Sequence, residues 1–167
     1  SGWIDHTVRL PNNPVEMQKR EPESIVENFR ALKTGVDGRP HYRLEAHTLK
    51  HYSGDLPSEL EEPRFSQRTD SGGPTQARAH SAVLSADGNT VTLSRQVTIE
   101  RSFDGQPGLT LHTERLILEP DLGRLTAPGP VVIDDRLWHA SANRLELDSH
   151  TRIVKLSGRV RAVYRHA

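Results

Sequence analysis

Apolar and polar residues alternate along most of the chain. In residues 153–165, small or apolar side chains occupy the even positions, whereas Lys155, Ser157, Arg159 and Arg161 occupy odd ones. Successive side chains of a β-strand point to opposite faces, so this run predicts a strand with one buried face. From about residue 25 onward, clusters of Gly, Pro, Asn and Asp interrupt such runs at a spacing of roughly 8–12 residues. The pattern predicts an all-β sandwich, barrel or jelly roll.

One segment also fits a helix. Ile25, Phe29 and Leu32 have the i, i+4, i+7 spacing of an amphipathic helix. Phe29 and Ala31 equally suit a strand that ends at the Thr34-Gly35 turn. We expect a strand here.

The first 24 residues differ from the rest. They contain Pro11, Pro14, Pro22 and the pair Asn12-Asn13, with little periodicity, which predicts a flexible leader ahead of a single domain at 25–167. The chain starts with Ser1-Gly2 and no Met. We therefore expect that the natural protein carries a further N-terminal segment, either an anchor or a signal.

Two internal repeats alternate along the chain. Residues 77–99 match residues 140–162 at one offset of 63, with Ala77 over Ala140, Leu93 over Leu156 and Ser94 over Ser157 among the equivalences. Residues 42–65 match 109–132 at an offset of 67, and this alignment equates Leu44 with Leu111, Leu49 with Leu116, Pro63 with Pro130 and Phe65 with Val132. Stacked copies of one strand unit would extend a single core.

Each repeat contains the same phase slip. Apolar positions run with period 2 through Leu44 and Ala46 and then jump three residues to Leu49, and the jump from Ala79 to Ala82 repeats it. A one-residue slip would turn all later side chains to the wrong face of a flat strand. We therefore predict a bulge or bend at each slip that keeps both halves of the strand on one core.

The amino-acid composition argues against several classes of function. Lys and Arg number 22, as do Asp and Glu, so a net charge of zero argues against a nucleic-acid-binding protein or a polybasic membrane binder. The absence of cysteine excludes disulfides, cysteine metal sites and thiol catalysis. Only 34% of residues are hydrophobic, and the mean hydropathy is −0.65, so the apolar residues must be concentrated on one face.

Candidate chemistry is sparse. Nine histidines occur without an H-x-H or H-E-x-x-H pattern, so we expect solvated histidines, no metal and no cofactor. The adjacent carboxylates Glu61-Glu62 and Asp134-Asp135 would point to opposite faces of a strand, and no G-x-S-x-G or phosphate-binding loop is present. We therefore expect the protein to have no enzymatic activity.

The last predicted strand carries a stripe of basic residues, Lys155, Arg159, Arg161 and Arg165. This stripe fits either a solvated edge strand or a surface that binds an anionic group.

Distributed motifs resemble the LptC family of lipopolysaccharide-export proteins. Glu27-Asn28-Phe29, residues 37–46 with the sequence DGRPHYRLEA, His51-Tyr52 and Glu62-Pro63 are similar to its opening repeat. Residues 77–99 are similar to the repeat that this family shares with LptA. The chain departs from that repeat at Arg95, where related repeats often carry Gly, as the chain itself does at Gly158.

The resemblance implies a twisted, open, V-shaped β jelly roll of two antiparallel sheets, without catalytic activity. It implies a periplasmic domain held at the inner membrane by an N-terminal helix. It also implies that the domain receives lipopolysaccharide from the inner-membrane ABC transporter LptB2FG through its N-terminal edge and passes it to LptA through its C-terminal edge. Free edges also make a homodimer conceivable.

The side chains that carry these expectations follow from strand parity. We expect the lipid-binding groove to be lined by Phe29, Leu44, Leu49, Leu60, Leu84, Leu93, Val97, Leu111, Leu116, Leu118, Leu145, Leu147, Leu156, Val160 and Tyr164. The expected partner edges are Val26, Asn28, Arg30 and Leu32 at one end, and Val160, Arg161, Ala162, Val163, Tyr164 and Arg165 at the other.

Three other interpretations remain open, and one of them is a purely structural assembly module. A soluble LptA-like periplasmic chaperone would have the same fold without an anchor. A metal-dependent jelly-roll enzyme of the cupin type would require His47, His80, His112 or His139 to converge inside the barrel.

Overall fold

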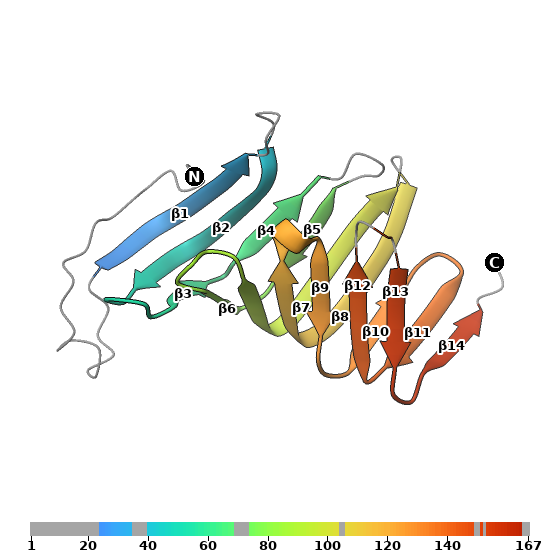
Figure 1. Ribbon diagram of the computed structural model, residues 1–167. Coiled ribbons are helices and arrows are strands. Elements are labelled where there is room, and N and C mark those ends of the chain that lie inside the picture. The colour runs from blue at the N-terminus through green and yellow to red at the C-terminus, as the bar shows by residue number, and fades with distance from the viewer. Residues whose placement is uncertain are drawn as a thin grey trace.

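The computed structural model describes residues 24–34, 40–68, 74–103, 106–148, 151 and 153–164 (Figure 1). The leader expected at residues 1–24 lies outside these ranges apart from Ser24, as does Arg165 of the expected C-terminal edge. Among the described residues, no helix is long and apolar enough to cross a membrane.

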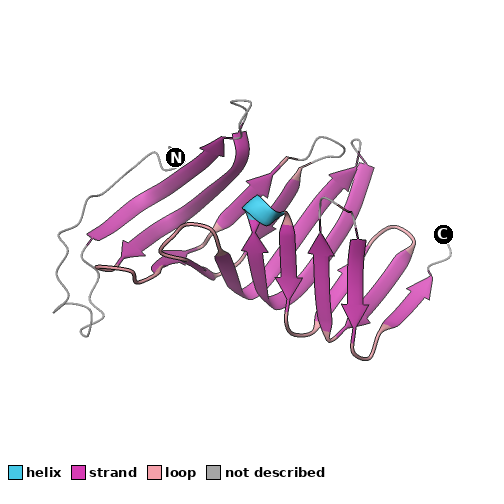
Figure 2. Cartoon of the chain, in the orientation of Figure 1, coloured by secondary structure: helices cyan, strands magenta, loops and turns pink. Residues whose placement is uncertain are grey.

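Nearly all of the described chain is antiparallel β-sheet, as expected, and Figure 2 shows the short helical turn among the strands. The strands are β1 Ser24–Thr34, β2 Pro40–His51, β3 Ser58–Glu61, β4 Arg64–Gln67, β5 Thr75–Arg78, β6 Ser81–Leu84, β7 Val91–Phe103, β8 Gln106–Glu119, β9 Arg124–Ala127, β10 Val131–Asp134, β11 Trp138–Ala142, β12 Arg144–Asp148, β13 Ile153–Ser157 and β14 Arg161–Tyr164. The helical turn η2 spans Pro120–Leu122.

The strands form one continuous 14-stranded sheet that is folded into two arms. Long strands cross the fold: the start of β7 pairs with β6 and its end pairs with β5. The first arm contains β3, β6, β9, β12 and β13, and the second contains β4, β5, β10, β11 and β14. Strands β1, β2, β7 and β8 contribute one half to each arm. The two sheets expected from the sequence are therefore the two arms of one sheet.

The line along which the sheet folds, which we call the corner, is built by kinked backbone. Arg95 and Gln96 have φ of 68° and 51°, and the β7–β8 register shifts between Ser94 and Val97. Gly158 and Arg159, 63 positions later, have φ of 75° and 46°. These bulges let the residues on both sides of the kink point into one core. The phase slips lie on the same line, because residues 113–116 are opposite the Arg95-Gln96 bulge and residues 79–82 connect β5 of one arm to β6 of the other, which confirms the predicted bend.

The offset of 63 also describes the strand pairing. Ser81 lies opposite Ser94 in the first copy, and Arg144 lies opposite Ser157 in the second. The corner hydrogen bonds repeat as well, because His80 N donates to Arg95 O at 3.0 Å and Asn143 N donates to Gly158 O at 2.8 Å. The repeat at the offset of 63 is therefore a structural unit.

The other repeat alignment is wrong in the second arm. The offset of 67 equates Leu44 with Leu111 and Phe65 with Val132. In the structure Phe65 lies opposite Leu44, but the residue opposite Leu111 is Ile133 and not Val132. Ile133 is buried, whereas Val132 is 36% exposed. The connection containing Pro128, Gly129 and Pro130 is one residue longer than the Glu62-Pro63 connection, and one extra residue reverses the side-chain parity.

The C-terminal run is also not one strand. Gly158 and Arg159 turn the chain from β13, which pairs with β12, into β14, which pairs with β11. Val160 therefore lies between two strands and not within an edge strand. At the other end of the chain, β1 confirms the strand expected in place of a helix at residues 25–32.

Candidate functional site

The candidate site is the apolar interior between the two arms. In the first arm, apolar residues that lie opposite one another form an unbroken row across consecutive strands: Leu84, Val91, Leu118, Leu125, Leu147 and Val154. The facing row in the second arm is Ala31, Leu44, Phe65, Ala77, Ile99, Leu111, Ile133, Ala140 and Ala162. The second row extends from the free edge of β1 to the free edge of β14.

Most of the predicted groove residues lie in this interior. Phe29, Leu44, Leu49, Leu60, Leu84, Leu93, Val97, Leu111, Leu116, Leu118 and Leu145 are buried in one core cluster. Leu147 and Leu156 are partly buried and pack against that cluster. Val160 and Tyr164 are 50% and 49% exposed, so the structure does not bring these two into the closed core.

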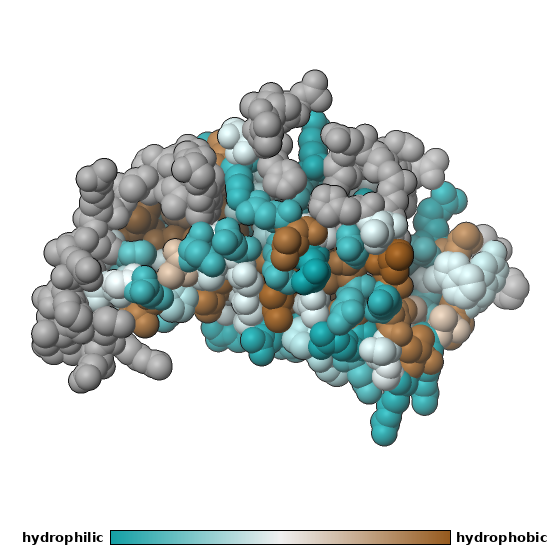
Figure 3. All heavy atoms as spheres, viewed as in Figure 1, coloured by the Kyte–Doolittle hydropathy of each residue, from teal (hydrophilic) through white to brown (hydrophobic). Residues whose placement is uncertain are grey.

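Burial decreases toward the C-terminal end of the interior. Ala31 and Leu44 near the first edge are fully buried, whereas Val154 at the end of the first-arm row is 49% exposed. At the same end, Ala162, which ends the second-arm row, is also exposed. Figure 3 shows apolar surface over these C-terminal strands at the right of the view. The interior is thus closed at the β1 end and open at the β13–β14 end of the described chain.

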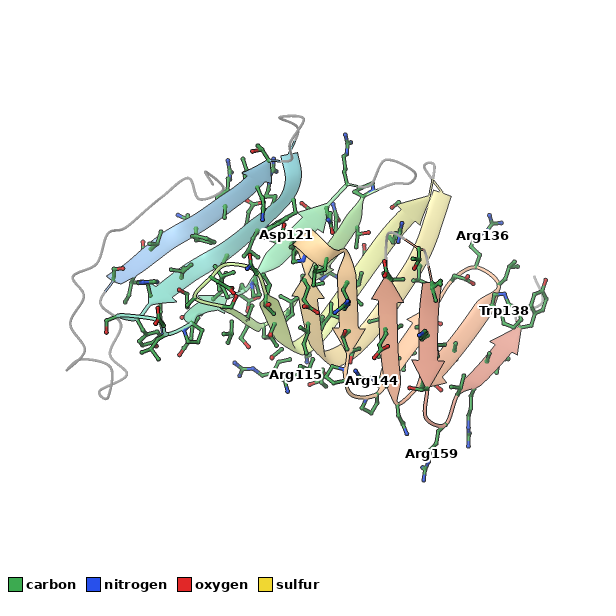
Figure 4. All side chains as sticks on the ribbon, viewed as in Figure 1. Arg115, Asp121, Arg136, Trp138, Arg144 and Arg159 are labelled. Atoms are coloured by element: carbon green, nitrogen blue, oxygen red, sulfur yellow. The ribbon has the colours of Figure 1, made fainter. Side chains whose placement is uncertain are left out.

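An aromatic pair lies on the rim of the open end. Trp138 of β11 and Tyr164 of β14 are opposite one another, with ring centroids 5.1 Å apart in an edge-to-face arrangement. Figure 4 places Trp138 at the far C-terminal end of the second arm. Both rings are about half exposed, so they present apolar surface to solvent or to a partner.

A small opening leads between the arms near the middle of the molecule. It has a volume of about 40 Å³ and contains Phe65, Ala77 and Ile99 from the second arm opposite side chains from the first. Gln67, Thr75, Arg101 and Arg124 also line it, and η2 contributes Pro120 beside it. The side chains therefore fill most of the space between the arms, and the opening is narrow there.

An ion pair joins the arms beside this opening. Lys33 Nζ in the second-arm half of β1 lies 2.5 and 2.6 Å from the carboxylate oxygens of Asp121 in η2, which follows the first-arm end of β8. Figure 4 shows Asp121 on this turn, in front of the strands of the second arm. Gly123 ends η2 with φ of 63°, and its N–H donates to Pro120 O at 3.1 Å. We call the Lys33–Asp121 pair with η2 the clasp.

The clasp lies over a buried tyrosine. Tyr42 is opposite Lys33 in the β1–β2 register and is 3% exposed. Burial, and to a lesser degree the negative charge of Asp121, raise the pKa of Tyr42 to about 12. Its hydroxyl therefore stays protonated at physiological pH.

In the part of the chain that the structure describes, both ends of the sheet are free edges. The predicted edge residues Val26, Asn28, Arg30 and Leu32 lie on β1, which pairs only with β2. Arg161, Ala162, Val163 and Tyr164 form β14, which pairs only with β11. Strand β13, which pairs with β12, is a second C-terminal edge that alternation alone did not predict, because the apolar and polar residues of 153–165 alternate as in one strand. The 63-residue offset onto β7, which spans both arms, contained the signal.

The histidines do not form the site that a cupin-type enzyme would need. His47, His80 and His112 are exposed on the outside of the sheet, and His139 is half-buried beside Asp134, with Nδ1 2.6 Å from Oδ1. The four therefore do not meet in the interior. Within the described ranges, no group of three or more His, Asp or Glu side chains is arranged to hold a metal.

Comparisons with known proteins agree with this architecture. The family described as "Lipopolysaccharide-assembly, LptC-related" matches residues 1–165. No curated protein sequence matches the chain. Among solved structures, the chain is similar to LptH from Pseudomonas aeruginosa, described as the LptA-homologous periplasmic component of the conserved lipopolysaccharide transport device. The TM-score is 0.61 at 11% identity, over 75% of this chain and 95% of LptH.

Proposed function

Because the chain belongs to the LptC-related family of lipopolysaccharide-assembly proteins, we propose that its interior carries the acyl chains of lipopolysaccharide between two partner proteins. The observation that carries this proposal is the unbroken apolar row that reaches from the edge of β1 to that of β14. Acyl chains would lie along this row while the sugars remain in water. Each buried methylene contributes about 0.8 kcal/mol, so a few contacts suffice for binding that is still reversible.

The partial exposure of the C-terminal half supports a direction of transfer. Val154 and Ala162, which end the two rows, are exposed, as a junction with a following protein requires. We place the acceptor, an LptA-type protein, on β13 and β14, and the inner-membrane transporter on β1. Unpaired strand edges bind partners by adding strands, so each junction would extend the sheet and the apolar row of the second arm.

The proposal assigns the chain no catalytic step and no cofactor. It places the domain in the periplasm, tethered to the inner membrane. The likeness to LptH also favours a second candidate, a soluble chaperone of the LptA type. Fractionation of cells expressing the full-length natural protein separates the two, because only the tethered protein stays with the inner membrane after washing at high salt.

Site-specific photocrosslinking tests the proposed path. Neighbouring residues on β12 offer a matched pair: Leu147 packs against the core, whereas Glu146 has the opposite strand parity. A photoreactive amino acid at Leu147 should crosslink to added lipopolysaccharide, and one at Glu146 should not. Equal crosslinking at both positions, or none at Leu147 and Leu156, would contradict an interior path.

A further inference from the structure

A second concavity lies on the opposite side of the sheet from the apolar interior. It has a volume of about 960 Å³ and is lined by β1, β2, β4, β5 and β7 together with the corner that joins them. Arg64 and Arg78 line it, whereas their neighbours Phe65 and Ala77 point into the core. Because adjacent strand residues face opposite ways, this concavity is on the outer face. We call it the outer hollow.

Two arginines of like charge face each other in the outer hollow. Arg64 of β4 is directly opposite Arg78 of β5, and Glu45 of β2 is opposite Arg64 on the other side. Like charges at directly opposed positions destabilise a sheet. Glu45 lies 3.6 Å from Arg30, and Arg78 lies 3.7 Å from Glu100. Arg64 forms no ion pair with any residue that the structure describes.

The fold itself does not require these arginines. The equivalent positions of the second pair of repeats are Val132 of β10, which lies opposite His112, and Ser141 of β11, which lies opposite Val132. The same strands therefore assemble there with no charge at either position. The opposed arginines are a property of the N-terminal half alone, which indicates a role other than maintaining the sheet.

The corner adds neutral and acidic hydrogen-bonding groups. His80 Nε2 lies 2.7 Å from Gln96 Oε1, and His80 Nδ1 lies 3.8 Å from Glu62 Oε1. Glu62 and Gln96 both have φ of 51°, in the left-handed region that non-glycine residues seldom adopt. Residues held in such conformations concentrate at functional sites.

We propose that the outer hollow binds a saccharide that carries a phosphate group. Guanidinium groups bind phosphate with paired, charge-assisted hydrogen bonds, and the uncompensated Arg64 with Arg78 supplies such a position. The surrounding carboxylates, amides and imidazoles suit sugar hydroxyls. The volume is that of a small-molecule site. The sheet of the second arm separates this site from the proposed acyl-chain path, so the two sites function independently.

Binding of a phosphorylated disaccharide tests the proposal. We would titrate the full chain with trehalose 6-phosphate, with trehalose and with inorganic phosphate, using calorimetry and amide NMR shifts. Trehalose 6-phosphate should bind at least about tenfold more tightly than either fragment and should shift amides at residues 43–47, 62–66 and 76–80. Equal binding of phosphate alone, or shifts that lie elsewhere, would overturn the proposal.

Matched variants identify the groups responsible. Arg64→Gln and Arg78→Gln should each weaken binding of trehalose 6-phosphate by about tenfold or more. Arg115→Gln is the control, because Arg115 is an exposed arginine opposite Ser94, outside the outer hollow (Figure 4). Circular dichroism confirms that each variant folds. Unchanged binding in both outer-hollow variants would contradict the assignment.

The result is separable from the proposed transport function. Lipopolysaccharide crosslinking at Leu147 should be unchanged in Arg64→Gln, since that side chain is on the other face of the sheet. Loss of sugar-phosphate binding with retained crosslinking supports the outer hollow as a separate site. Loss of both in a folded variant would show that Arg64 belongs to the transport path, and the proposal would be wrong.

Discussion

Lys33 of β1 and Asp121 of η2 form an ion pair that connects the two arms of the sheet across their open side, with Nζ 2.5 and 2.6 Å from the carboxylate oxygens. The two residues are 88 positions apart in the sequence. The ion pairs Arg30–Glu45, Lys50–Glu61 and Arg78–Glu100 each lie within one arm. The Lys33–Asp121 pair therefore restrains the separation of the arms near the β1 end.

Removal of the clasp should widen the interior more than it destabilises the fold. Lys33→Ala should lower the free energy of unfolding by no more than about 1 kcal/mol, because the pair is partly solvated. It should increase the binding of an apolar fluorescent dye and lipopolysaccharide crosslinking at Leu147. Lys50→Ala is the control, since Lys50 pairs with Glu61 at 3.2 Å within one arm. Equal dye binding in both variants would argue against a restraining role.

Tyr42 should make the protein less stable in strong alkali. Its pKa rises from 10.0 to about 12 in the folded state, so the unfolded chain loses the phenolic proton first. This contribution to stability is complete below pH 10 and is lost as the pH rises through about 12, at roughly 1.4 kcal/mol for each pH unit between the two values. Urea unfolding at pH 8 and pH 11 measures it. Tyr42→Phe should flatten that pH dependence relative to the unsubstituted chain.

A side chain at Gly158 should destabilise the C-terminal corner. A Cβ there would lie 2.7 Å from Asn143 Cβ, and φ is +75°. Gly158→Ala should therefore lower the free energy of unfolding by about 1–3 kcal/mol. Gly129→Ala serves as the matched control, because a Cβ at Gly129 meets nothing within 4 Å. Equal stability of the two variants in urea would contradict the geometry of this corner.

The corresponding change at Arg95 should act in the opposite direction. Arg95 adopts φ of 68° where the equivalent residue is Gly158. Arg95→Gly relieves the left-handed strain but makes the unfolded chain more flexible, and the net gain should be about 0.5–1 kcal/mol. Thermal unfolding measures it. A lower melting temperature would show that the Arg95 side chain stabilises the corner by contacts that outweigh the strain.

The β14 edge should be needed for binding of the acceptor protein. Val163 is 60% exposed on this edge, so Val163→Lys should leave the fold intact while it weakens capture of an LptA-type partner at least about tenfold. Val83→Lys is the control, because Val83 is 40% exposed on β6, which is paired on both sides. Capture is measured with immobilised partner. Equal capture by both variants would place the acceptor elsewhere.

The repeats explain how much of the fold was predictable. Alternation at Leu44, Ala46 and Leu49 identified the inner face and located the bend, because strand parity is a local property. The offset of 63 reproduced the pairing of Ser81 with Ser94 in the second copy. The offset of 67 failed at Val132, because the residue added before β10 changes parity without changing the apolar character of the segment.

The candidate site was less predictable than the fold. Parity indicates which side chains face inward, but not whether another strand covers them, so Tyr164 was expected in the groove and is half exposed. The clasp pairs one of 22 basic residues with one of 22 acidic residues, and their spacing in the sequence does not show which two meet. The outer hollow arises from cross-strand register, which requires the relative position of Arg64 and Arg78 in three dimensions.

The corner has a mechanical consequence. The long strands β1 and β7 pass from one arm to the other through kinked backbone, at Asn28 and at Arg95-Gln96, and each is paired along its length with a long strand that also crosses the corner. Widening the gap between the two arms at one strand must also bend the neighbouring strands at the corner, because adjacent strands are hydrogen-bonded along their length. The gap between the arms should therefore widen gradually along its length, and it should widen most easily at the β13–β14 end, which is farthest from the clasp.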